Sequence, residues 1–217
     1  MSINIAIDGP AGAGKSTIAK MVAKKLGYIY VDTGAMYRAM ALFIMRQGID
    51  PSDSVTISKE CNNADISIKY ADGAQVVLLN GENVNGLIRT EEVGNMASST
   101  SVNPDVRKKL VDLQRILAKK ENVVMDGRDI GTVVLPDAKV KIYLTASSKV
   151  RAERRFLELK AKGIEADIET IEKDIIERDY RDMNREISPL KKADDAILID
   201  SSEMTIDEVV EKMISLV

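Results

Sequence analysis

The feature that most constrains this chain is a glycine-rich segment near its start, Gly9 to Ser16. It reads Gly-Pro-Ala-Gly-Ala-Gly-Lys-Ser and matches the pattern of glycine, four variable residues, glycine, lysine and serine or threonine. A short apolar stretch at 3–8 precedes it and predicts a buried parallel strand. Residues 15–26 follow with apolar side chains at helical spacing. Strand, glycine loop and helix in this order are typical of a phosphate-binding loop.

The chemistry of such a loop follows from its residue types. Glycines let successive backbone N–H groups surround a phosphate, and the helix N-terminus adds positive potential. Lys15 can reach the outer phosphates of ATP, and the Ser16 hydroxyl can bind Mg²⁺. The alternative, a structural turn that is rich in glycine by chance, is disfavoured by the flanking strand and helix. We expect the ATP-binding residues to be Gly9, Pro10, Ala11, Gly12, Ala13, Gly14, Lys15, Ser16 and Thr17.

The rest of the chain alternates strand and helix patterns, which predicts an α/β fold with a parallel sheet covered on both faces. The further strands are expected at 28–31, 123–126, 140–144 and 196–199. Residues 63–86 depart from the alternation, with period-two apolar residues around an Asp72-Gly73 turn, and predict an antiparallel insertion. The polar connector at 160–167, between helical patterns at 149–159 and 168–185, is either a lid or a plain helix–helix turn.

Composition narrows the chemistry. The length of 217 residues suits one compact domain, and 31 basic against 34 acidic side chains argue against nucleic-acid binding. No stretch is apolar for long enough to be a signal peptide or a membrane span, so a cytoplasmic protein without membrane partners is expected. Cys61 is the single cysteine and histidine is absent, so catalysis must come from carboxylates, lysine, arginine and backbone.

Two aspartates close predicted strands beside the loop. Asp126 has the form of the carboxylate that orders magnesium in such sites, although a strand that ends in Asp before Gly is also an ordinary turn. Asp8 carries the same two interpretations. The sequence leaves open which of the two orders the metal shell.

Arginines are the expected partners of phosphates, because the guanidinium binds phosphate oxygens bidentately and stays charged. Arg38 and Arg128 follow predicted strands at the edge where α/β sheets bind ligands. In the helix from Ile168, an apolar stripe continues into charged residues, either as the lining of a cleft or as a solvated face opposite Ile176, Tyr180 and Met183. That charged continuation is Arg178, Asp182 and Arg185. Local sequence slightly favours a solvated face for the cluster Arg151, Arg154 and Arg155.

A phosphate-binding loop does not by itself fix the reaction, because GTPases, motor ATPases and small-molecule kinases share it. A GTPase would normally carry an Asn-Lys-x-Asp element, and this chain has no Asn-Lys dipeptide and no Asp-x-x-Gly. A signalling GTPase is therefore disfavoured.

Five segments, the glycine loop among them, resemble the bacterial cytidylate kinases, over nearly the whole chain. They are Ile-Asp-Gly-Pro-Ala-Gly-Ala-Gly-Lys-Ser at 7–16, Asp-Thr-Gly-Ala-Met-Tyr-Arg at 32–38, Ile-Arg-Thr-Glu-Glu-Val at 88–93, Asp-Gly-Arg-Asp-Ile-Gly-Thr at 126–132 and Glu-Arg-Asp-Tyr-Arg-Asp-Met-Asn-Arg at 177–185. The segments at 32–38 and 126–132 are quite specific to that family. An adenylate kinase would show Asp-Gly-Phe-Pro-Arg, which is absent.

The resemblance implies transfer of the ATP γ-phosphate to CMP or dCMP, with Mg²⁺, in pyrimidine nucleotide metabolism. By similarity, Lys15, Arg128, Arg185 and Asp126 are the catalytic set, and Ser16 binds the metal. The CMP-binding set is Thr33, Arg38, Ser98, Arg107, Asp129, Arg178, Asp182 and Arg185. Of these, Ser98, Arg107 and Asp129 resemble the residues that read the base, and Arg178 and Asp182 the pair at the sugar. Many relatives have Ser at 33 and Gly at 16, which leaves both proposed roles intact.

The resemblance also implies a nucleoside monophosphate kinase fold with a five-stranded parallel sheet, a β-containing acceptor-binding insertion and a short lid. The expected division is a core at 1–62, 87–150 and 168–217, an insertion at about 63–86 and a lid at about 151–167. ATP and CMP or dCMP are the expected small-molecule partners, and a monomer is expected. Two other functions stay open on the residues: a P-loop kinase with another small acceptor, and a nucleotide-dependent switch or assembly ATPase.

Overall fold

The computed structural model describes residues 2–71 and 74–217, and these fall into two compact units. The first unit takes in the chain up to Ile29 and from Asn122 onward, and the second is Tyr30–Glu121. The expected Asp72-Gly73 turn lies outside the described residues. Each unit is described by itself.

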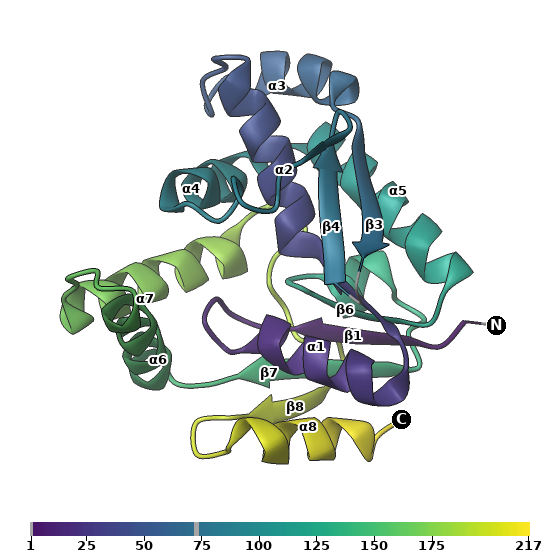
Figure 1. The fold of residues 1–217 in the computed structure, drawn as a ribbon, viewed down its shortest axis with the longest axis vertical. Helices are drawn as coiled ribbons and strands as arrows, with labels where there is room; N and C mark the ends of the chain where they lie inside the picture. The colour runs from purple at the N-terminus through teal and green to yellow at the C-terminus, as the bar shows by residue number, and fades with distance from the viewer. Residues whose placement is uncertain (1, 72–73) are drawn as a thin grey trace. The chain divides into compact units, whose positions relative to one another are not determined.

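The first unit carries most of a parallel sheet. Its strands are β1 (Asn4–Asp8), β6 (Val123–Gly127), β7 (Val140–Thr145) and β8 (Ile197–Asp200). Its helices are α1 (Lys15–Leu26), the π-helix η2 (Ile130–Val134), α6 (Ser148–Ala161), α7 (Ile168–Asn184) and α8 (Ile206–Ile214). Figure 1 shows α1 and α8 beside this sheet, and α6 and α7 as an antiparallel pair.

The strand order of the sheet is β2-β6-β1-β7-β8, where β2 is Ile29–Asp32. β1 lies between β6 and β7, and Ile5, Ala6 and Ile7 are fully buried because both faces are covered. The register pairs Asp8 with Gly127 on one side and with Tyr143 on the other. Parallel register therefore brings the carboxyl ends of β1 and β6 together, directly before the glycine loop.

The second unit joins helices to a small antiparallel sheet. Its helices are α2 (Thr33–Arg46), α3 (Ser54–Glu60), the 3₁₀ turn η1 (Cys61–Asn63), α4 (Glu91–Thr100) and α5 (Pro104–Lys120). Its sheet has the order β3-β4-β5, with β3 at Ile66–Ala71, β4 at Ala74–Leu79 and β5 at Glu82–Asn83. The long helix α2 packs against α4, β4 and α5.

Side-chain caps explain where these helices start. Asp32 accepts a hydrogen bond from the N–H of Ala35, Thr90 from Val93 and Asn103 from Asp105 and Val106. Such caps satisfy backbone donors that the first helical turn leaves unpaired. The cap at Asp32 fixes the point where β2 turns directly into α2.

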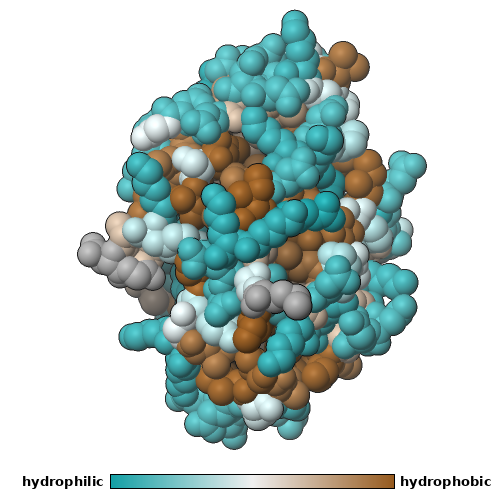
Figure 2. All heavy atoms as spheres, turned by 90° about the vertical axis from the view of Figure 1, so that its right-hand side faces the viewer, coloured by the Kyte–Doolittle hydropathy of each residue, from teal (hydrophilic) through white to brown (hydrophobic). Residues whose placement is uncertain are grey.

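The α/β fold predicted from the sequence is confirmed, with a five-stranded parallel sheet and an antiparallel insertion. The connector predicted at 160–167 is shorter, because α6 continues to Ala161 before a turn in which Gly163 has a φ of 71°. Among the described residues, no helix is long and apolar enough to cross a membrane. The face drawn in Figure 2 carries patches of hydrophobic side chains between hydrophilic ones.

Candidate functional site

The glycine loop of the first unit has a backbone that other residues would not adopt. Gly9, Gly12 and Gly14 have φ angles of 150°, 75° and 83°. These values lie in the region that side chains with a Cβ rarely enter. At Gly9 a Cβ would also collide with the carbonyl oxygen of Leu144 on β7. The loop therefore passes close to the sheet before it opens α1, whose N-terminus points a partial positive charge at any bound phosphate.

Lys15 is buried at the start of α1, and its Nζ donates a hydrogen bond of 2.7 Å to the carbonyl of Pro10. Burial, with help from the charge of Arg128, lowers the pKa of Lys15 well below its usual range, and Asp126 and Asp8 oppose that shift. An anionic phosphate near Nζ would favour the charged ammonium. The side chain is thus held in the loop where it would meet phosphates.

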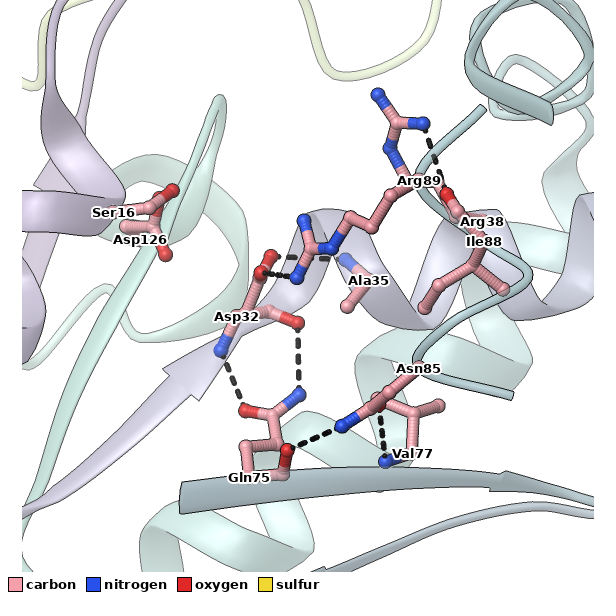
Figure 3. A network of polar contacts seen from close by, with 10 residues as sticks. All are labelled: Ser16, Asp32, Ala35, Arg38, Gln75, Val77, Asn85, Ile88, Arg89 and Asp126. Carbon is pink, nitrogen blue, oxygen red and sulfur yellow. Dashed lines mark hydrogen bonds and ion pairs between the residues drawn. The ribbon is translucent and has the colours of Figure 1, made fainter. Parts of the chain in front are cut away.

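Ser16 and Asp126 meet although 110 residues separate them. The Ser16 hydroxyl donates a 2.8 Å hydrogen bond to Oδ2 of Asp126, which is buried one residue before the end of β6 (Figure 3). A hydroxyl and a carboxylate at this place form an oxygen donor set, which is what Mg²⁺ prefers. The residues present therefore fit a magnesium ion that accompanies a nucleotide.

Asp8, the other candidate for the metal shell, has different partners. Its two carboxylate oxygens accept hydrogen bonds of 2.7 Å from the N–H groups of Ile130 and Gly131, in the first turn of η2. Burial raises its pKa to about 6, and the charge of Asp129 adds to this, while the two N–H groups and Lys15 oppose it. Asp8 therefore holds the loop after β6, and Asp126 is the carboxylate that contacts the P-loop.

Arg128 and Asp182 form an ion pair in the first unit, with 2.9 Å between Nε and Oδ2. Burial alone would raise the pKa of Asp182, but the charge and hydrogen bond of Arg128 lower it below its usual value. The charges of Arg178 and Arg185 lower it further. The charges of three arginines, from the motifs at 126–132 and 177–185, thus act on one buried carboxylate.

The helix α7 decides between the two interpretations of its charged stripe. Ile175, Asp179 and Asp182 are buried, and Arg178 and Arg185 are half-buried on the same side. The opposite face is the exposed one. The three apolar side chains expected there to pack are instead 52%, 69% and 46% exposed, for Ile176, Tyr180 and Met183. The interpretation of a solvated charged face is therefore wrong for this helix, because Asp182 and Asp179 pair with Arg128 and Arg151.

The expectation of a solvated cluster at 151–155 is wrong for Arg151. Its side chain is 6% exposed, and its Nη2 lies 2.6 Å from Oδ2 of Asp179. Nε donates to the carbonyl of Ala146 and Nη1 to the carbonyl of Ala11 in the P-loop, both at 2.9 Å. Arg154 bonds to Ser201, so of the three only Arg155 is exposed.

In the second unit, Arg38 lies on α2 with its guanidinium turned toward α4. Its Nη1 donates to the carbonyls of Ile88 at 3.0 Å and Thr90 at 3.1 Å. Thr33, the first residue of α2, is buried. Both residues therefore follow β2 directly, as the motif at 32–38 predicted.

Arg107 and Ser98 lie on α5 and α4 of the same unit. Arg107 is buried, its Nη1 donates to the carbonyl of Ser101 at 3.2 Å, and its guanidinium lies 5.6 Å from the ring centre of Tyr37 on α2. Ser98 is half-buried one turn after Gly94. The second unit thus gathers Thr33, Arg38, Ser98 and Arg107, while Asp129 belongs to the first unit.

Comparison with known proteins decides the family. The model of the family described as cytidylate kinase matches residues 5–217. The chain belongs to the cytidylate kinase family. A cytidylate kinase of Caldicellulosiruptor saccharolyticus is 55% identical over 99% of this chain and 95% of its own length, and one of Geobacillus sp. (strain WCH70) is 50% identical over 100% and 96%. Family membership makes the chain a nucleoside monophosphate kinase, as its motifs indicated.

Solved structures with little sequence identity share the fold of this cytidylate kinase family member. A shikimate kinase from Bacteroides thetaiotaomicron superposes with a TM-score of 0.51 at 13% identity, covering 99% of this chain and 97% of that one. An uncharacterised protein from Eubacterium ventriosum gives a TM-score of 0.55 at 14% identity, covering 99% and 97%. At such identities the likeness extends to the fold and no further.

One part of this cytidylate kinase was missed by sequence reasoning. The side-chain amide of Gln75, on β4, accepts from the N–H of Asp32 at 2.8 Å and donates to its carbonyl at 3.3 Å (Figure 3). Arg89 bonds to the carboxylate of Asp32 at 2.7 Å, and Asn85 donates to the carbonyl of Gln75 at 2.9 Å. The insertion therefore holds the first turn of α2, and no local pattern around Gln75 could have indicated it.

Proposed function

We propose that this chain transfers the γ-phosphate of ATP to CMP or dCMP and releases ADP with CDP or dCDP. The observation that carries the proposal is the family match over residues 5–217, together with relatives named cytidylate kinase at half identity or more over nearly the full length. The acceptor oxygen attacks the γ-phosphorus while the bond to the β-phosphate oxygen breaks. The acceptor phosphate is already an anion at neutral pH, so the reaction needs no general base.

The ATP half of the reaction is assigned to the first unit. The N–H groups of residues 9–17, Pro10 excepted, would bind the phosphates, and Lys15 would neutralise charge on the transferring group. Ser16, with Asp126 behind it, would hold Mg²⁺, which would neutralise phosphate charge when it is bound. The hydrogen bond of Ser16 to a buried carboxylate supports this assignment.

Arginines are assigned to the charge that develops in transfer. Arg128 and Arg185 would contact the transferring phosphate, and Arg38 the acceptor phosphate. Their guanidiniums suit several phosphate oxygens at once and keep their charge at every physiological pH. The ion pair of Arg128 with Asp182 supports the proposal, since it fixes the direction of that side chain before substrates bind. The connector of α6 and α7 would act as the lid that excludes water.

Acceptor selectivity is assigned to Ser98, Arg107 and Asp129 for the base, and to Thr33, Arg178 and Asp182 for the rest of the nucleotide. Cytosine offers an amine donor beside two acceptors, which a carboxylate and a guanidinium complement. Uracil has a carbonyl in place of the amine and would leave the carboxylate unpaired, which costs about 1–3 kcal/mol of binding free energy. We further propose a monomer that works in the cytoplasm.

A panel of acceptors tests the function. Release of ADP is measured with CMP, dCMP, UMP, AMP, shikimate and no acceptor, with the Lys15→Ala variant as the matched control. CMP and dCMP should stimulate turnover, UMP less, and Lys15→Ala should lower the rate by about 10²-fold or more while its circular dichroism is unchanged. Stimulation by another acceptor but by neither cytidine nucleotide would contradict the proposal, and so would near-normal turnover of the variant.

A further inference from the structure

Arg38 is fixed by backbone groups of the segment that leads into α4. Both carbonyls that its Nη1 contacts, those of Ile88 and Thr90, belong to this segment, and Thr90 is also the N-cap of α4. The dashed bond from Arg38 to Ile88 is visible in Figure 3. Two donor contacts on one nitrogen set the plane of the guanidinium as well as its position. The orientation of Arg38 is therefore determined within the second unit.

Gly94 lies against this guanidinium. It is buried in the second turn of α4, on the side of that helix that packs against α2. A Cβ at residue 94 would lie 3.0 Å from both Nη1 and Nη2 of Arg38 and 3.3 Å from its Cζ. Contacts at these distances are tighter than those that real Cβ atoms usually make, so one added methyl group would displace the guanidinium.

The backbone of α4 gives no reason for this glycine. Gly94 is not among the glycines with positive φ, so its conformation is one that alanine adopts easily. Glycine weakens a helix interior relative to alanine, because it loses more conformational freedom on folding. A side chain at this position would therefore occupy the space that Gly94 leaves for Arg38.

We infer that Gly94 is a positioning residue for phosphoryl transfer: by lacking a side chain, it lets Arg38 lie flat on α4 in the orientation in which it meets the acceptor phosphate. The inference rests on the proposed function, because the role of Arg38 at the acceptor is part of that proposal. Displacing the guanidinium by a few tenths of an ångström changes the angles of its hydrogen bonds, and bidentate binding of phosphate depends strongly on such angles.

The Gly94→Ala variant tests the inference, with Asn95→Ala as the matched control on the same helix. Asn95 is exposed, and its replacement also raises helix propensity. We expect Gly94→Ala to raise the KM for CMP about tenfold, equal to one charge-assisted hydrogen bond, with the KM for ATP within about twofold of normal. The melting temperature should stay equal or rise. Asn95→Ala should leave both KM values unchanged.

A double-mutant cycle with Arg38→Lys separates this inference from the function on which it rests. Lysine lacks the planar fork that contacts residue 94, so Gly94→Ala should add nothing to the KM for CMP in the Arg38→Lys background. An additive effect there, or a normal KM in the single variant, would overturn the inference. If Arg38→Lys itself leaves the KM for CMP unchanged, the proposed role of Arg38 has failed instead. If Gly94→Ala alone proves unstable, comparison of the double variant with Arg38→Lys decides the matter, because equal KM values for CMP are expected for these two variants.

Discussion

Asp8 is a residue whose charge depends strongly on its surroundings. It ends β1 with 4% of its surface exposed, and burial raises its pKa to about 6 against an ordinary value of 3.8. The folded protein therefore binds this proton more tightly than the unfolded chain does. The resulting stabilisation is fully present below about pH 4 and is lost as the pH rises through about 6. At neutral pH, the hydrogen bonds from Ile130 and Gly131 offset part of what burial of the charge costs.

Replacing Asp8 by Asn should remove this pH dependence. Asparagine keeps one acceptor oxygen and has no charge, so the variant loses a hydrogen bond to η2 and the coupling to pH together. We expect the melting temperature of the unmodified protein, minus that of Asp8→Asn, to increase as the pH falls from 7 to 4. Thermal melts at several pH values measure it, with the exposed Asp65→Asn as control. A difference that stays constant over this range would contradict the assignment of the raised pKa.

Among the elements, α6 contacts the P-loop through a buried side chain. Arg151 in its first turn contacts the carbonyl of Ala11 in the loop and the carboxylate of Asp179 on α7. A Cβ on Gly12 would also lie 3.4 Å from the Cβ of Arg151, so the loop rests against this side chain. The helix α6, most of which falls in the expected lid region at 151–167, thus shares one buried arginine with α7 and the phosphate-binding loop, all within the first unit.

Arg151→Met should weaken both stability and ATP binding, and a second substitution should separate the two effects. The single variant leaves Asp179 buried without its partner, which typically destabilises by about 3–5 kcal/mol. The double variant Arg151→Met with Asp179→Leu should recover much of the melting temperature. Its KM for ATP should stay about tenfold raised, because the carbonyl of Ala11 still lacks the hydrogen bond from residue 151. Arg155→Met, at an exposed pair with Glu158, is the control. A normal KM for ATP in the double variant would contradict the role of Arg151 in positioning the P-loop.

Some contacts between the elements could be predicted from the sequence, and others could not. The P-loop was predictable because its information is local: a strand, glycines with positive φ and a helix follow one another directly. The contact of Ser16 with Asp126 could be expected, since parallel strands end at one edge. The burial of Arg151 and the hydrogen bonds of Gln75 to Asp32 could not be predicted, because they depend on packing between segments far apart in the chain. The polar residues around Arg151 predicted a solvated side chain, whereas the side chain is buried.

At the scale of the whole molecule, the chain passes between its two units at residues 29–30 and 121–122. The second unit joins the predicted insertion to the helices α2, α3, α4 and α5, with α2 packed against β4, α4 and α5. Alternating patterns predict strands and helices one by one but do not say which of them pack into one unit, since that depends on long-range contacts. The division into core, insertion at 63–86 and lid at 151–167 stays a prediction.

Binding of the acceptor should stabilise the native chain by mass action. A ligand that binds only the folded state at about 100 times its Kd adds about 2.7 kcal/mol to the free energy of unfolding, which for a chain of about 200 residues raises Tm by roughly 5–10 °C. We expect calorimetry to show a rise of this size with CMP and a smaller rise with UMP at the same concentration, because uracil would leave Asp129 without a donor. In the Asp129→Ala variant the difference between the two nucleotides should shrink.

Since the chain has two compact units, each transition in the calorimetric trace is compared separately. Equal shifts with CMP and UMP in the unmodified protein would mean that the base is not read by this carboxylate, and no shift with CMP would argue against a cytidine acceptor altogether.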